Sequence, residues 1–322
     1  MKFKTIGWAA GLALLLSGGM AAAEQYRLGL ITPPSHQWSV HAQKAADAIK
    51  EKTDGRVEIS LFPSGQLGSE AQMLQQLQTG ALDFAFLTVG EFANRDPNYG
   101  IFLAPYLVSD IEGAKTVLGG ATAGKLLADM NKFGLVGLGW SSAGMRTVVM
   151  RGTIANVGDL AGKKIRTVPN APELDFWTLL GATPTPMPLP ALYDALANGQ
   201  VDGAQLDHEG TWNTKYYDHA GTIIDSRHMM FPMVAVASGR KWQAISEEDR
   251  AAIQEIMTAN FTDIIDAYGA LDNKYMEDLK TTPVPVVTVD RAWFGPAVDK
   301  WYEDWRVKAP LLVELEAELA SN

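Results

Sequence analysis

The feature of this sequence that most constrains its fold is a regular alternation of strand and helix patterns. Strand patterns over residues 26–32, 56–62 and 82–87 alternate with helical patterns over 38–53 and 69–80. Each helical pattern ends at a glycine, the residue that most readily takes the left-handed conformation after a helix. Strands joined by helices in this order predict an α/β fold with a mostly parallel sheet covered by helices.

The same alternation recurs further along the chain. Strand patterns lie at 135–140, 146–150, 163–168, 201–206 and 233–238, and helical patterns at 172–180 and 190–198. The segment around Gly80 echoes the one around Gly199, since both read Leu-x-x-Gly followed by an aliphatic residue and an aspartate. Two similar series of elements in 322 residues favour two α/β lobes.

A long helical pattern follows the second series. Ser246 and Asp249 have the spacing of a helix N-cap, and the pattern continues to about Lys280. A helix of that length would extend about 45–50 Å, which is longer than one lobe, so we expect it to brace both lobes. The aromatic-rich stretch 291–319 is also predicted to be helical.

The N-terminus has the order of a secretory signal peptide. Lys2 and Lys4 precede an apolar run over 6–16, and small residues follow, ending Ala-Ala-Ala at 21–23. The apolar run is shorter than the roughly 20 residues that span a bilayer, so we expect cleavage after Ala23 rather than an anchor. The predicted location is therefore the periplasm.

Composition excludes several classes of function. The chain has no cysteine, so disulfides, thiolate nucleophiles and cysteine-based metal sites are excluded. The net charge is −10, and loss of a leader carrying Lys2 and Lys4 makes it −12. A chain this acidic is a poor partner for nucleic acid or an anionic membrane. An anionic ligand would need locally placed positive charge.

Catalytic and cofactor motifs are incomplete. The run from Gly119 to Lys125 has the glycine spacing of a P-loop, but Leu126 stands where a magnesium-binding hydroxyl is required. We therefore expect a turn between two helices there. The five histidines show no metal-binding spacing, and no dinucleotide-binding glycine motif follows a strand. The sequence predicts no cofactor, no metal and no catalytic residues.

Two arginines occupy positions that suit anion binding. Arg146 begins a strand pattern after the small residues 141–144, and Arg166 lies near the end of the strand pattern 163–168. Ligands of open α/β folds bind at the carboxyl ends of strands. A guanidinium can hold a carboxylate through two parallel hydrogen bonds, which a lysine cannot do. Either arginine could equally be paired with a carboxylate of the chain itself.

Six motifs together resemble one known family. They are Phe-Pro-Ser-Gly-Gln-Leu-Gly at 62–68, Leu-Gln-Thr-Gly-Ala-Leu-Asp at 77–83, Ala-Pro-Tyr at 104–106, Leu-Ala-Gly-Lys-Lys-Ile-Arg at 160–166, Leu-Gly-Ala-Thr-Pro-Thr-Pro-Met at 180–187, and Leu-Tyr-x-Ala-Leu-x-x-Gly-x-Val-Asp-Gly at 192–203. In this order they resemble the substrate-binding subunits of TRAP transporters, the DctP-type family, over essentially the whole exported chain.

The resemblance implies a two-lobed periplasmic-binding-protein-like fold with a cleft between the lobes and a long helix spanning both. By matching segments, the first lobe would comprise 24–143 plus 232–271. The second lobe would comprise 144–231 plus 272–322. The family closes on a ligand, usually an organic anion, and delivers it to a membrane permease driven by an ion gradient.

The resemblance also implies site residues. The family's main carboxylate-binding arginine corresponds to Arg166, and a second arginine of its sugar-acid binders corresponds to Arg146. Asn170 follows the Arg166 strand and is expected to be a polar partner. Glu70 and Thr88 correspond to first-lobe ligand positions in the family's sialic-acid binders.

Departures from the family pattern fall at the far side of the expected pocket. Leu206 stands where an asparagine often touches ligand, and Leu189 where an aromatic residue is common. Asp207, with its neighbour His208, is expected to supply the polar contact instead. The carboxylate anchor is therefore kept while the distal pocket differs, which argues against sialic acid.

Three tryptophans and one histidine have two interpretations each. Trp177 lies on a helical pattern and is predicted to pack in the core. Trp212 and Trp38 could line the cleft or the core, and His36 could approach ligand beside Trp38.

The sequence therefore predicts a binding protein, not an enzyme, that captures a small organic acid by arginine–carboxylate pairing and delivers it to TRAP permease subunits. Two alternatives stay open at this stage: an ABC-type periplasmic binding protein, and a periplasmic enzyme on a binding-protein fold.

Overall fold

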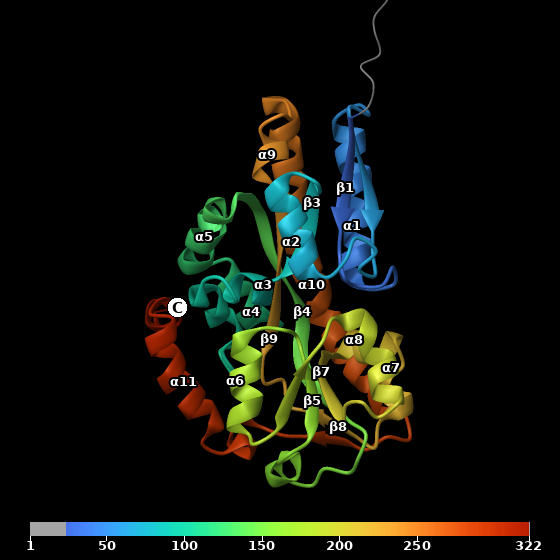
Figure 1. The fold of residues 1–322 in the computed structure, drawn as a ribbon, viewed down its shortest axis with the longest axis vertical. Coiled ribbons are helices and arrows are strands. Elements are labelled where there is room, and N and C mark those ends of the chain that lie inside the picture. The colour runs from blue at the N-terminus through green and yellow to red at the C-terminus, as the bar shows by residue number, and fades with distance from the viewer. Residues whose placement is uncertain (1–23, 322) are drawn as a thin grey trace, which may run out of the picture.

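The structure is a computed structural model and describes residues 24–321 (Figure 1). The predicted leader, 1–23, lies outside the described residues. The strands are β1 (Glu24–Gly29), β2 (Val57–Phe62), β3 (Phe84–Thr88), β4 (Leu135–Met150), β5 (Lys164–Thr167), β6 (Thr183–Pro186), β7 (Gly203–Asp207), β8 (Thr222–Asp225), β9 (Met230–Ser238) and β10 (Val286–Thr288).

The helices alternate with these strands as the sequence predicts. They are α1 (Gln37–Lys52), α2 (Glu70–Thr79), α3 (Val89–Ala93), α4 (Ile111–Leu118), α5 (Ala121–Ala128), α6 (Ala171–Leu179), α7 (Leu192–Ala197), α8 (His208–Asn213), α9 (Gly239–Trp242), α10 (Glu247–Lys280), α11 (Ala297–Lys308) and α12 (Leu311–Ala320), with shorter 3₁₀ turns that include η1 (Pro97–Leu103) and η4 (Leu189–Ala191). The helix-to-helix turn predicted for the run from Gly119 to Lys125 is confirmed at Gly119 and Gly120, which separate α4 from α5, whereas Gly124 and Lys125 lie inside α5.

The strands form two groups that are joined through the paired strands β4 and β9. In the first group β1 pairs in parallel with β2 and β3, and β9 continues the sheet antiparallel to β3. In the second group β5 pairs in parallel with β6 and β7. We call these groups with their covering helices the first and second lobes. Strand β4 runs through both, because it pairs with β9 along its first part and with β7 and β8 along its last part.

Strand β4 is continuous where the sequence predicts two strands. The sequence predicts two strands, at 135–140 and 146–150, but the chain between them stays in the sheet. A register shift between Ser142 and Met145 marks an irregularity there, and Gly144 has a φ of 69°. A β-bulge bends a strand without ending it, which is why small residues are found inside β4. The bend lies directly before Arg146, where β4 turns from one lobe to the other.

Helix α10 braces the molecule as predicted. Its 34 residues extend about 51 Å at 1.5 Å per residue. The Ser246 side chain accepts a hydrogen bond from the backbone N–H of Asp249, which confirms the predicted N-cap. The helix packs against α1 of the first lobe, against β4, and against α8 of the second lobe (Figure 1). It is therefore a common support for both walls of the cleft between the lobes.

The C-terminal segment is not one helix. Pro310 cannot continue a helical hydrogen-bond ladder, and α11 ends at Lys308 before α12 begins at Leu311. Helix α11 packs against α6 of the second lobe, whereas α12 packs against α5 and η1. The last segment of the chain therefore touches both lobes, and the predicted lobe boundaries remain a prediction. Among the described residues, no helix is long and apolar enough to cross a membrane.

Candidate ligand-binding cleft

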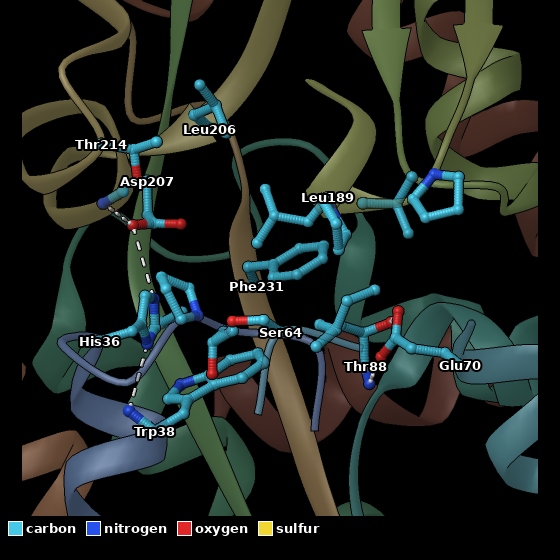
Figure 2. Close-up of a pocket in the computed structure, with 18 of the residues that line it drawn as sticks. His36, Trp38, Ser64, Glu70, Thr88, Leu189, Leu206, Asp207, Thr214 and Phe231 are labelled. Carbon is cyan, nitrogen blue, oxygen red and sulfur yellow. Dashed lines mark hydrogen bonds and ion pairs between the residues drawn. The ribbon is translucent and has the colours of Figure 1, made fainter. Parts of the chain in front are cut away.

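A cavity of about 310 Å³ lies between the two lobes, and it is lined by the chain that follows the carboxyl ends of six strands (Figure 2). The lining after β1, β2 and β3 includes Thr32, His36, Ser64 and Thr88. The lining from β5, β6 and β7 includes Arg166, Val168, Pro169, Leu189, Leu206 and Asp207. Parallel strands of both lobes thus point their carboxyl ends at one space, the usual location of ligands in open α/β folds.

Arg166 lies at the second-lobe wall of the cavity and is 2% exposed. Its Nε and Nη2 both donate to the carbonyl oxygen of Met187, at 3.1 and 2.9 Å. These bonds fix the guanidinium plane and leave Nη1 without a partner among residues 24–321. In that range no carboxylate lies within ion-pair distance of this arginine. Burial lowers the pKa of Arg166 to about 10, although the Glu173 charge opposes that shift from beyond ion-pair distance, so Arg166 is still a cation at neutral pH.

Arg146, by contrast, is paired with a carboxylate of the chain itself. Its Nη1 lies 3.2 Å from Oδ2 of Asp207, directly across the β4–β7 pair. The guanidinium carbon lies 3.4 Å from the centre of the Phe231 ring, in the geometry of a cation–π contact. Burial lowers the pKa of Arg146, and the charges of Glu173 and Asp207 partly offset that shift. Asp207 also accepts from the backbone N–H of Gly210 at 2.6 Å, capping α8.

A polar cluster joins the lobes beside Asp207. Glu209 accepts from the backbone N–H of Gln37, at the start of α1, at 3.0 Å, and from the hydroxyl of Tyr268 on α10. His36 Nε2 lies 3.5 Å from Oε2 of the same carboxylate. Burial raises the pKa of Glu209, while His36 and Tyr268 oppose that shift. Three segments distant in sequence meet at this one side chain, so it links the α1 end of the first lobe to α8 of the second.

The same cluster brings three potential metal-ligand side chains together. Ligand atoms of His36, Asp207 and Glu209 lie within 4.8 Å of one another. However, His36 Nδ1 accepts from the backbone N–H of Trp38, which places the ring proton of the neutral form on Nε2, facing the carboxylates (Figure 2). A protonated nitrogen cannot ligate a metal, so the arrangement fits a hydrogen-bond network.

Glu70 and Thr88 meet at the first-lobe wall. The backbone N–H of Thr88 donates to Glu70 Oε1 at 2.6 Å, and its hydroxyl donates to Oε2 at 3.1 Å (Figure 2). Desolvation raises the pKa of Glu70 to about 7, although the Thr88 hydrogen bonds and the Arg166 charge lower it. This carboxyl group is therefore near its titration midpoint at neutral pH. The capping box of Ser69 and Gln72 sets its position at the start of α2.

The structure brings six of the eight predicted site residues to the cavity. They are Arg166, Arg146, Asp207, Glu70, Thr88 and His36. Asn170 is not at the cavity, since its side chain caps α6 and bonds to Glu173. Trp212 packs against Tyr217 and the small apolar cluster of β8 and α10 instead.

Other expectations concern neighbouring side chains. Trp38 lines the cavity and stacks on Phe231. Trp177 is buried, as predicted, and donates to Gln205 at 2.8 Å. His208 is fully buried, does not line the cavity, and bonds to the backbone oxygen of Asp272 at 3.0 Å.

Sequence reasoning missed Phe231 and Glu209. Phe231 lies within an apolar strand and gives no sign of its contact with Arg146, because that contact joins residues 85 positions apart. Glu209 follows β7 by two residues, and only its proximity to Asp207 in sequence could have drawn attention to it.

The fold and cleft define a class: two-lobed proteins that enclose a small anionic ligand between strand ends. The profile of the family described as bacterial extracellular solute-binding protein, family 7 (DctP), matches residues 28–307, and the chain belongs to this family.

Relatives and solved structures of this kind agree with that membership. The chain is 27% identical over 315 residues to the 2,3-diketo-L-gulonate-binding periplasmic protein YiaO of Escherichia coli, covering 96% of this chain and 95% of that protein. It is 28% identical over 247 residues to the sialic acid-binding periplasmic protein SiaP of Vibrio cholerae, covering 76% of each.

A similar solved structure is that of a TRAP periplasmic solute-binding protein from Xanthobacter autotrophicus Py2 with bound β-D-galacturonate. The TM-score is 0.85 at 28% identity, over 91% of this chain and 100% of that one. A second, from Roseobacter denitrificans with bound β-D-glucuronate, has a TM-score of 0.84 at 26% identity and covers 91% and 99%. The predicted family and the two-lobed α/β fold are thus confirmed.

Proposed function

We propose that this protein is exported to the periplasm, captures a small organic acid in the cleft between its lobes, and delivers it to the membrane subunits of a TRAP transporter. The relatives named above are periplasmic, and two of the similar structures hold sugar acids. The predicted leader is in keeping with export.

One observation carries the ligand class: the cavity holds two buried guanidinium groups and only one of them is paired with a carboxylate of the described chain. A buried cation without a counter-ion is costly, and a ligand carboxylate would offset that cost. Nη1 of Arg166 has no acceptor in the described chain; Nε of Arg146 also has none, but Arg146 already has Asp207 as its counter-ion. We therefore assign the ligand carboxylate to Arg166.

The same geometry supports binding without turnover. The carboxylates that line the cavity are bonded to Arg146, Thr88 or Arg95, and His36 accepts a backbone N–H, which argues against a free general base beside a nucleophile. The proposed role is capture and release through lobe movement.

A thermal-shift screen tests the ligand class. The purified protein is heated with organic acids, sugar acids, amino acids and their neutral amides. A ligand at about 100-fold excess over its Kd stabilises the native state by roughly 2.7 kcal/mol. We expect shifts confined to carboxylates, whereas shifts with amides or amines alone would contradict the proposal. Product formation on prolonged incubation would indicate an enzyme.

A further inference from the structure

The wall around Arg166 is apolar. Val168 and Pro169 directly follow β5, the strand that carries the arginine, and Leu189 and Leu206 line the cavity from the neighbouring segments. Leu206 is 1% exposed, so its side chain is packed and not free to swing away. Figure 2 shows Leu189, Leu206 and Phe231 around the same part of the cavity. A ligand carboxylate on Arg166 would therefore place its adjoining atoms against carbon.

Aromatic rings extend this apolar surface. The Phe231 ring is stacked on Trp38 with an interplanar angle of 3° and a centroid distance of 6.4 Å. Its other interaction is with the Arg146 guanidinium. Because the ring covers that cation, Arg146 presents less charge to a ligand than its position alone would suggest.

Most of the deep polar side chains at the cavity are already bonded within the protein. The Thr32 and Ser39 hydroxyls bond to each other at 2.8 Å. Both carboxyl oxygens of Glu70 accept from Thr88, and both of Asp207 are bonded to Gly210 and Arg146. These bonds use part of the hydrogen-bonding capacity, so a ligand hydroxyl beside them would have to share acceptors that are already in use. A polar group buried without such a partner loses its hydration uncompensated.

Most lining hydroxyls that carry no bond within the described chain are on exposed or half-buried residues, and the exception is the hydroxyl of Tyr216, a residue only 3% exposed. Ser35 and Ser64 are exposed, and Thr214 is half-buried. They can hold one oxygen next to a carboxylate, but they do not surround the Leu189–Leu206 wall. A ring of hydroxyls would find few partners where the cavity is deepest.

We propose that the ligand is a carboxylate with an apolar body, an aryl or branched alkyl group, and that the protein discriminates against polyhydroxylated sugar acids. This inference rests on the proposed function, because it presumes that Arg166 holds the carboxylate. Leu206 and Leu189 are the specificity-determining residues, since they contact the ligand body and not its charge. The apolar wall favours an aryl or alkyl group by removing it from water.

The test is calorimetric titration of the purified protein with four probes: phenylacetate, 4-methyl-2-oxopentanoate, galacturonate and the neutral phenylacetamide. We expect at least one of the two apolar acids to bind tenfold or more tightly than galacturonate, with no detectable phenylacetamide binding. Galacturonate binding more tightly than both would overturn the inference and leave the proposed function intact. Binding of phenylacetamide alone, or of none of the probes, would overturn both.

Variants then locate the discrimination. In Leu206→Asn we expect the ratio of apolar-acid to galacturonate affinity to fall at least fivefold. Leu189→Asn, at a half-buried position, provides the same test if the Leu206 variant does not fold. Val313→Asn is the matched control, because Val313 lies on α12 and is 51% exposed. An unchanged ratio in both folded variants would contradict the assignment of these residues.

Discussion

Two buried arginines lie at one cleft, and their surroundings differ. Arg146 is bound to Asp207 and covered by Phe231, so its charge is compensated within the chain. Arg166 is held by a backbone carbonyl, which orients the guanidinium without neutralising it. The difference shows how a binding site can use one cation as structure and keep another for ligand. Residue type alone cannot separate the two roles.

Breaking the Arg146–Asp207 ion pair should have the largest effect of the changes proposed here, and that effect should be a loss of stability. Asp207→Asn keeps an oxygen to cap α8 but removes the charge, which leaves Arg146 buried without a counter-ion. Loss of one partner from a buried pair costs about 3–5 kcal/mol, so we expect the free energy of unfolding to fall by roughly 3 kcal/mol in urea titrations. Asp194→Asn, at an exposed position on α7, is the control and should change stability little. A wild-type midpoint for Asp207→Asn would show that the pair is not structural.

Removing Arg166 should instead act on affinity. Arg166→Ala deletes the uncompensated cation, and we expect carboxylate affinity to fall by about 2–3 kcal/mol because charge-assisted hydrogen bonds are lost. Arg166→Lys should recover only part of the lost affinity, since an ammonium group lacks the planar pair of donors that a guanidinium offers. Calorimetry with a carboxylate found in the screen measures both variants, and circular dichroism checks their folding. Equal affinity of Arg166→Ala and wild type would assign the carboxylate elsewhere.

The next largest effect should come from the hydrogen bonds at Glu209. Glu209→Ala removes the acceptor that joins Gln37 of the first lobe to α8, so the closed arrangement loses a bond between lobes. One hydrogen bond to a charged group contributes about 1.5–3 kcal/mol, and we expect ligand affinity to fall by the lower part of that range. Small-angle scattering with saturating ligand should show a larger radius for the variant than for wild type. Identical radii and affinities would remove this contact from the closing mechanism.

The smallest expected effect is on pH dependence. The pKa of Glu70 is raised to about 7, mainly by burial. A ligand carboxylate beside Arg166 would favour the protonated form of Glu70, so binding would take up protons and affinity should increase as pH falls from 8 to 6. A coupling of half a pKa unit corresponds to roughly threefold in affinity. Glu70→Gln should flatten the profile, although Glu91, whose pKa is also raised by burial, keeps part of the slope.

Much of this organisation could be predicted from the sequence, and the exceptions have physical reasons. Alternation, caps and glycine stops predicted the α/β elements and α10, because those signals are local. The continuity of β4 was missed because a bulge and a turn contain the same small residues. Its position after a strand predicts that Asn170 contacts the ligand, but an asparagine at that position can also cap the next helix, as it does here.

The pairing state of the two arginines could not be predicted for a different reason. Asp207 lies 61 residues from Arg146 and Met187 lies 21 residues from Arg166, so only the fold determines which arginine meets a carboxylate. The apolar wall could be predicted in part, because Leu189 and Leu206 depart from the family pattern.

The most direct test of this account is a crystal structure of the protein with the carboxylate that binds most tightly in the screen. We expect a ligand carboxylate oxygen about 2.7–2.9 Å from Nη1 of Arg166, the distance of a charge-assisted hydrogen bond. The Arg146–Asp207 pair should remain intact in that complex. A carboxylate bound to Arg146 in place of Asp207, or lying beyond hydrogen-bond reach of Arg166, would contradict the account.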